Sequence, residues 1–172
     1  KWLIEKAFRV SQDVYSTYTG DGTNKTFKLA QVSTSSDIVV YLDGVIQTTG
    51  FTIRKETRKL IFDTAPAANS EIRVLYDNFD FSLFQNRQIV GASSGATAIV
   101  ERTAQKTVNF VPIFELFINR KTLVGTFTSG ENANITIIDP DDNTLITLEL
   151  NGLSILKTIN IINSGASYNV GD

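Results

Sequence analysis

The stretch Asp139-Pro140-Asp141-Asp142-Asn143 has the residue types of a possible metal site. It places three carboxylates and an amide within five residues, and Ca²⁺ prefers oxygen ligands of this kind. The stretch lacks the EF-hand pattern, because a glycine is missing at its sixth position and an acidic residue at its twelfth. We interpret it as a polar turn that joins Ile138 to Leu145, and we predict no metal ligands.

The other candidates for chemistry also have structural interpretations. The basic run 54–59 could touch a phosphate or an acidic partner, but its place between two expected strands is typical of a solvated hairpin tip. Gly20-Asp21-Gly22 has neither the Lys-Ser/Thr pair of a phosphate-binding P-loop nor a third glycine, so it indicates a turn. Glu115 lies between Phe114 and Leu116, and we expect an edge strand or a paired core carboxylate there.

The composition excludes several classes of enzyme. The chain has 172 residues with no Cys and no His, which rules out zinc fingers, Cys nucleophiles and a Ser-His-Asp triad within it. Two of its eighteen acidic residues could still converge as the carboxylate pair of a glycosidase or depolymerase. No pattern singles out such a pair, and we predict no catalytic residues and no cofactor.

Charge and hydropathy limit the possible partners. The formal net charge is −2, without the basic excess typical of nucleic-acid binding. No apolar run approaches the ~20 residues of a membrane span. The chain contains no Met, even at position 1, and it ends in turn residues at 163–172. We therefore expect a processed product or a piece of a longer chain.

Two-residue periodicity dominates the sequence and predicts an all-β fold. Short β-branched and aromatic segments alternate with turns. The expected strands of the first block are 26–29, 37–43, 45–47, 51–53, 60–62 and 72–76. Those of the second block are 96–100, 110–117, 122–127, 135–138, 145–150 and 155–162. The segment 1–10 fits a helix or a strand equally well.

We predict two small β-sandwich or barrel-like modules joined by an aromatic-rich linker. The first covers residues 1–77, with 1–10 as a docking segment for a partner or an earlier module. The linker is 78–87, and the second β domain is 88–172, truncated at its C-terminal end. The expected partner contacts are aromatic residues that lie outside the expected strands: Trp2, Phe8, Phe79, Phe81 and Phe84.

An ordered series of motifs in the first block resembles a small β module of tailed-bacteriophage virion proteins, found in tail fibres and in baseplate or tail-appendage subunits. The series comprises 18–22, 27–29, 37–45, 50–53, 60–62, 65–67 and 71–74. It covers about 60 of the 172 residues. The sequence departs from the pattern at Asn69-Ser70, where glycine is usual, and at Phe51, where tyrosine is commoner.

Two shorter pieces are similar to repeats of large phage structural proteins. One combines 91–100 with 123–131, as a "sGAtAxV" segment followed by "GxFxxGE". The other is 159–172, which resembles the opening of a glycine-rich "GxgYxvGD" unit. The resemblance implies a structural component of a phage tail or baseplate, located in the virion. Such a chain would act through protein–protein assembly, as a homo-oligomer or with other virion proteins.

A second function class remains open at this point. The chain could be a carbohydrate- or receptor-binding module of a tail fibre that recognises a host-surface glycan. This alternative requires a solvent-exposed aromatic platform with polar neighbours. The sequence places seventeen aromatic residues (eleven Phe, five Tyr and one Trp) mostly at strand spacing, which suits a core or an interface as well as a platform.

Overall fold

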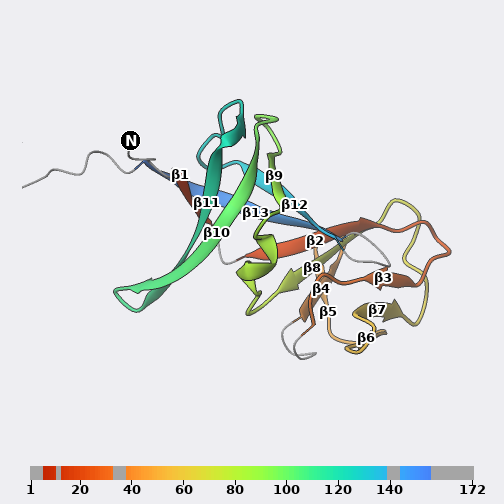
Figure 1. Cartoon of the computed structure of the whole chain (residues 1–172). Helices are drawn as coiled ribbons and strands as arrows, with labels where there is room; N and C mark the ends of the chain where they lie inside the picture. Colours follow the sequence, from red (N-terminus) through yellow and green to blue (C-terminus); the bar gives the residue numbers. More distant parts are fainter. Residues whose placement is uncertain (1–5, 11–12, 33–37, 139–143, 156–172) are drawn as a thin grey trace, which may run out of the picture.

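The computed structural model describes residues 6–10, 13–32, 38–138 and 144–155. These residues form strands connected by turns, together with a single-turn 3-10 helix at Phe81–Phe84. The strands build a barrel and a smaller two-sheet module, which lie side by side in Figure 1. The all-β prediction, with barrel- or sandwich-like modules, is confirmed.

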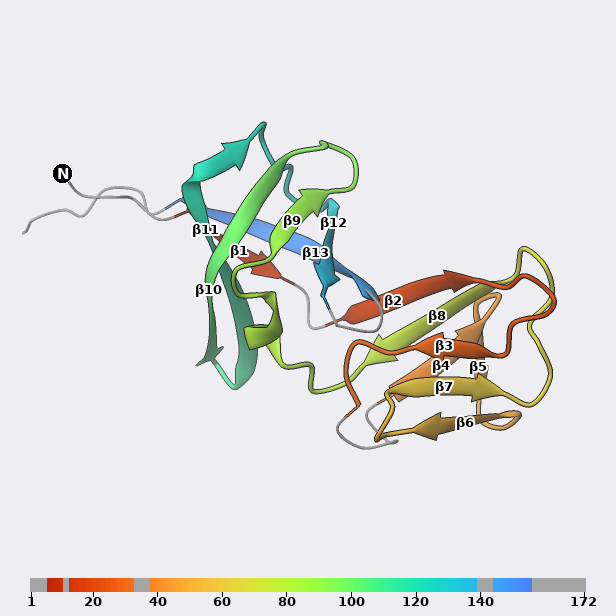
Figure 2. The same ribbon diagram turned by 45° about the vertical axis from the view of Figure 1, so that its right-hand side comes forward.

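The smaller module consists of two facing sheets. One sheet has the order β2 (Val14–Thr19), β8 (Glu71–Tyr76), β4 (Ile38–Leu42) and β5 (Val45–Gln47). The other has the order β3 (Thr26–Lys28), β7 (Lys59–Phe62) and β6 (Phe51–Arg54), as Figure 2 shows. Tyr18 of the first sheet packs on Phe27 of the second, with 5.4 Å between ring centroids. The alternating side chains of β8 bury Ile72 and Val74 completely in the core, as the period of two predicts.

Six antiparallel strands close into the barrel. Their order is β1 (Lys6–Val10), β11 (Val111–Val124), β10 (Thr97–Val108), β9 (Gln88–Gly91), β12 (Asn132–Ile137) and β13 (Thr144–Ile155), and β13 pairs with β1 again. Side chains fill the interior, including Phe8, Val100, Leu116, Ile135 and Leu148, all of them fully buried. A closed barrel has no free edge strands, which removes the tendency of such edges to aggregate.

The N-terminal strand lies where the sequence did not place it. We expected residues 1–10 to belong to the first module and to dock on a partner. Instead, β1 fills the gap between β11 and β13 of the second block. Phe8 is completely buried and packs edge-to-face on Phe127, with 5.0 Å between ring centroids. Residues 6–10 therefore dock within their own chain as the sixth strand of the barrel, and residues 1–5 lie outside the described residues.

The segment expected to be a linker is a buried aromatic joint. Phe79, Phe81 and Phe84 pack on one another at centroid distances of 5.1–6.0 Å. Their cluster continues to Tyr76 of β8 on one side and to Phe114 of β11 on the other. The short helix, whose first turn is capped by a hydrogen bond from the Ser82 amide to the Asp80 carboxylate, turns the rings inward.

The buried carboxylate of Glu131 connects two turns at one end of the barrel by hydrogen bonds. Glu131 accepts hydrogen bonds from the amide and hydroxyl groups of Ser93 and Ser94 and from the Thr128 amide. Burial raises the pKa of Glu131, but the hydrogen bonds, led by those from the Thr128 and Ser94 amides, outweigh it and lower the pKa to about 2. Gly91 lies tightly against this turn, because a Cβ there would lie 2.3 Å from Ser94 Oγ and 2.7 Å from Glu131 Oε2, so these hydrogen-bonded side chains would have to move.

Candidate functional site

The hairpin of β10 and β11 projects from the barrel. Strand β1 pairs with β11 only as far as Phe114, which lies opposite Val10. Beyond it, within the described part of the chain, β10 and β11 pair only with each other, down to Val108 opposite Val111. Figure 1 shows the hairpin extending away from the rest of the barrel. It is therefore an arm that can reach another molecule without moving the core.

Phe110 at the tip combines exposure with an unfavourable backbone conformation. The two-residue loop Asn109-Phe110 has positive φ at both positions, 50° and 65°, as a type I′ turn requires. Asparagine tolerates the first position, whereas the second strongly favours glycine. Bulky residues are genuine outliers at such φ values. Phe110 is nevertheless 98% exposed, so no contact within the chain compensates for this conformation.

Two valines extend the apolar surface around Phe110. Val108 is 43% exposed and Val111 is 57% exposed, and they are paired directly across the base of the loop. We call Val108, Phe110 and Val111 the apolar tip. Residues held in disfavoured backbone conformations cluster at binding and catalytic sites, and none of these three can do acid–base or nucleophilic chemistry. The apolar tip is therefore suited to docking.

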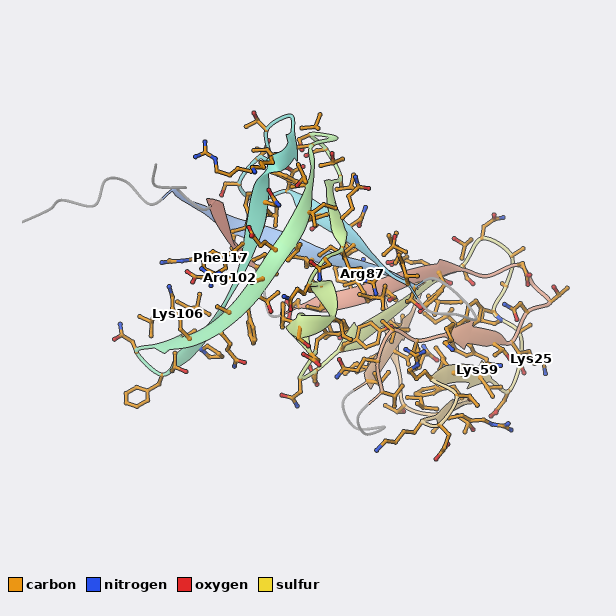
Figure 3. All side chains as sticks on the ribbon, viewed as in Figure 1. Lys25, Lys59, Arg87, Arg102, Lys106 and Phe117 are labelled. Atoms are coloured by element: carbon orange, nitrogen blue, oxygen red, sulfur yellow. The ribbon has the colours of Figure 1, made fainter. Side chains whose placement is uncertain are left out.

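The outer face of the arm carries more positive than negative charge. Glu115 of β11 is buried between Lys106, whose Nζ lies 2.6 Å from its carboxylate, and Arg9, whose Nε lies 3.9 Å from it. On the same face, the Arg102 guanidinium lies 3.4 Å from the centroid of the Phe117 ring. Figure 3 shows Lys106, Arg102 and Phe117 on the arm. We call Arg9, Arg102, Lys106 and Glu115 the basic shaft, because its three cations and one carboxylate give it a net positive charge.

The residues expected to contact partners lie elsewhere. Phe8 is inside the barrel, and Phe79, Phe81 and Phe84 form the joint, all between 0% and 8% exposed. We expected these four rings to contact partners, but each is buried and packs on other rings of the same chain. Trp2 lies outside the described residues.

The charged candidates that lie within the described residues have the structural roles expected from the sequence. The basic run 54–59 caps the β6–β7 hairpin. Asp21 accepts hydrogen bonds from the amides of Thr23 and Asn24, as a turn residue does. Glu115 is a paired carboxylate on a central strand, with β1 and β10 on either side. The segment 139–143, the possible Ca²⁺ site, lies outside the described residues.

Sequence reasoning missed the apolar tip. It placed Phe110 at the start of an expected strand and left 101–109 unassigned, whereas β10 continues to Val108. The available signal was Asn109, because asparagine is common at the first position of a type I′ turn. The absence of the usual glycine after it concealed the turn.

Comparison with known proteins gives no assignment for this chain: no protein-family model, curated protein or solved structure matches it. Within the described residues, no helix is long and apolar enough to cross a membrane. The same part of the chain contains no cluster of three or more acidic side chains that could hold a metal ion.

Proposed function

We propose that this chain is a structural module of a phage tail or baseplate, and that it assembles with a neighbouring virion protein through the apolar tip of the β10–β11 arm. The observation that carries the assembly role is Phe110, an aromatic ring 98% exposed at a position that favours glycine. Aromatic residues are common among the few side chains that dominate binding at protein interfaces.

The neighbouring surface should combine an apolar pocket with an acidic rim. The pocket would take the Phe110 ring and the two flanking valines. The acidic rim would face the basic shaft, where Arg9 and Lys106 have side chains about half exposed. Charge complementarity of this kind speeds association and is weakened by salt. We therefore expect the assembly to weaken as the ionic strength rises.

The assignment to a phage particle is supported by the resemblance described above and by the structural roles of the residues that carry it. Glu131 and the Ser93-Ser94 turn, both within the matched segments, hold one end of the barrel together. Asn69, at the position where the pattern has glycine, has a φ of 68°, a conformation that asparagine tolerates better than most residues. The motifs therefore coincide with backbone requirements of the fold.

Incorporation into particles tests this proposal. Particles would be produced from a phage genome in which the gene copy for this chain is deleted, with tagged wild-type protein, Phe110→Ser or Val124→Ser supplied in trans. Val124 is a matched control, since it is also exposed but lies at the other end of the arm. We expect the wild type and Val124→Ser to be incorporated, and Phe110→Ser to be reduced about tenfold or more, as for an interface hot spot.

Two results would contradict the proposal in different ways. If no peptide of the chain is found in purified particles, the assignment to the virion is wrong. If Phe110→Ser is incorporated as efficiently as the wild type, the chain assembles through another surface.

A further inference from the structure

A groove of about 440 Å³ lies where the outer face of the β2–β8–β4 sheet meets the barrel strands β12 and β13. Its volume is within the range of small-molecule sites, roughly 300–1,000 Å³. It is separate from the apolar tip, since no residue of the tip lines it. The residues that matter for its chemistry are Asp13, Tyr15, Tyr41, Arg73, Asn132 and Glu149.

The strand register places the two tyrosines and the arginine on one surface. Arg73 of β8 lies between Thr17 of β2 and Tyr41 of β4. Tyr15, two residues before Thr17, shares this face because side chains alternate along a strand. The opposite face of the same strands is buried in the module's core, so this face is turned outward. Both tyrosines are half-buried.

The barrel supplies the other wall of the groove. Thr147 of β13 pairs with Tyr15 of β2, which joins the two parts of the chain at this point. Asn132 and Glu149 are directly paired on β12 and β13, and both are exposed. An amide and a carboxylate from the barrel therefore face the same space as the tyrosines of the smaller module.

Contacts on the sheet hold Arg73 in place. Its guanidinium lies 5.1 Å from the centroid of the Tyr15 ring, and one of its nitrogens is 3.3 Å from a carboxylate oxygen of Glu71. Stacking on an aromatic ring fixes the plane of a guanidinium while leaving its edge available for hydrogen bonds. The groove thus has a positioned set of donors beside an aromatic surface.

The chemistry of the groove favours a neutral, polyhydroxylated ligand. Among the described residues that line it, the charged groups are one arginine and two carboxylates, Asp13 and Glu149, and this negative balance disfavours phosphates and other anions. Leu75 is the only aliphatic side chain larger than alanine among the described lining residues, which is too little for an apolar ligand. Guanidinium, amide and carboxylate groups together can donate to and accept from neighbouring hydroxyls.

We propose that this groove binds a neutral saccharide. The apolar face of a pyranose ring lies against Tyr41, and its hydroxyls bond with Arg73, Asn132 and Glu149. Because the residues come from both the smaller module and the barrel, the site requires the two parts to be together. The inference is independent of assembly through the apolar tip, and either can be wrong without the other.

Titration of the isotopically labelled whole chain with saccharides, followed by NMR, tests the site. The probes are neutral hexoses, their N-acetylated derivatives and disaccharides of these. Because a shallow polar groove binds a single sugar weakly, Kd values on the order of millimolar are expected. We expect at least one probe to give saturable shifts in the amide resonances of β2, β4, β8 and β13 around the groove, and none at the tip of the arm.

Variants separate the saccharide site from a non-specific effect. Tyr41→Ala should weaken binding about tenfold, as expected for loss of an aromatic contact, whereas Tyr41→Phe should retain most of it. Glu149→Gln should weaken it while leaving the spectrum of the free protein folded. Val124→Ala, at the far end of the arm, should bind as the wild type does.

Three outcomes would overturn the proposal. The first is the absence of saturable shifts with every saccharide at tens of millimolar. The second is binding that is unchanged in Tyr41→Ala. The third is a groove that responds to a lysine-rich peptide and to no saccharide, in which case its two carboxylates recognise a basic protein segment instead.

Discussion

Phe110→Gly is a substitution that should strengthen the fold while it weakens assembly, and the two effects have separate physical causes. A left-handed backbone conformation costs a residue with a Cβ roughly 1–2 kcal/mol, and Phe110 has a φ of 65°. Glycine removes this cost but adds freedom to the unfolded chain, which takes back about 0.4–1 kcal/mol. Because the ring is 98% exposed, almost no buried surface is lost.

The two ranges leave a net gain in the free energy of unfolding of about 0–1.6 kcal/mol, with a central value of about 0.8 kcal/mol. For a chain of this size, each kcal/mol moves the Tm by roughly 2–4 °C, so Phe110→Gly should melt about 1–4 °C above the wild type. Urea denaturation and calorimetry measure this gain, and amide exchange at Val111 shows whether it is confined to the arm. Phe110→Ala is the matched control, because it removes the ring but keeps the Cβ.

Stability and assembly should therefore diverge in these variants. Both Phe110→Gly and Phe110→Ala should lose incorporation into particles, but only Phe110→Gly should gain stability. If Phe110→Gly is less stable than the wild type, or no more stable than Phe110→Ala, the reasoning about strain at the tip is refuted.

Three further predictions concern the framework that holds the arm and the groove. The Glu131 pKa is lowered from 4.5 to about 2 in the folded chain, which corresponds to at most roughly 3 kcal/mol of stability at pH 7 and to less after screening by solvent. This contribution is lost as the pH falls from about 5 to 2. Urea denaturation at pH 7 and pH 3 should therefore show a smaller pH-dependent loss for Glu131→Gln than for the wild type, and equal losses would contradict the role of this carboxylate. Phe84 is fully buried in the aromatic joint, so Phe84→Ala should lower the free energy of unfolding by about 3–5 kcal/mol. Ser82→Ala is the control, because Ser82 is exposed and its substitution should change the free energy of unfolding by less than about 0.5 kcal/mol. An equally small change for Phe84→Ala would mean that the ring is a surface contact. A Cβ at Gly20 would lie 2.3 Å from the Ala67 carbonyl oxygen, so Gly20→Ala should lower the free energy of unfolding by about 1–3 kcal/mol, as measured by thermal denaturation. Gly152→Ala is the control and should be nearly neutral, because a Cβ at Gly152 meets nothing within 4 Å.

Local patterns in the sequence were sufficient to predict the β class and most strands of the smaller module. In that module most strands have one buried and one exposed face, so alternation is clear, as in β8 with Ile72 and Val74 inward and Arg73 outward. The short strand β5 is an exception, because it has no buried residue. The turn at Gly20–Gly22 and the hairpin tip at 54–59 also follow from local residue chemistry. These features depend on neighbours in the sequence, which is why one sequence is enough to find them.

The long-range pairings could not be predicted in this way. β1 pairs with β11 and β13, more than 100 residues away, and nothing within Lys6–Val10 indicates those partners. Phe79 and Phe81 alternate with polar residues as in a strand, but the chain forms a 3-10 helix at Phe81–Phe84. The sequence therefore did not show which way the rings of the joint point. The groove requires Tyr15, Tyr41, Arg73 and Glu149 to converge from four strands, which only the tertiary fold reveals.

Photo-cross-linking from position 110 in intact particles shows whether the chain assembles through the apolar tip. Phe110 would be replaced with a photoreactive benzoylphenylalanine, and Val124, exposed at the other end of the arm, would be replaced in the same way as a control. We expect one discrete cross-linked product from position 110, joining the chain to a single neighbouring virion protein, and none of this product from position 124. Particles that contain the chain but give no cross-link from position 110, or give the same product from both positions, would contradict assembly through the apolar tip.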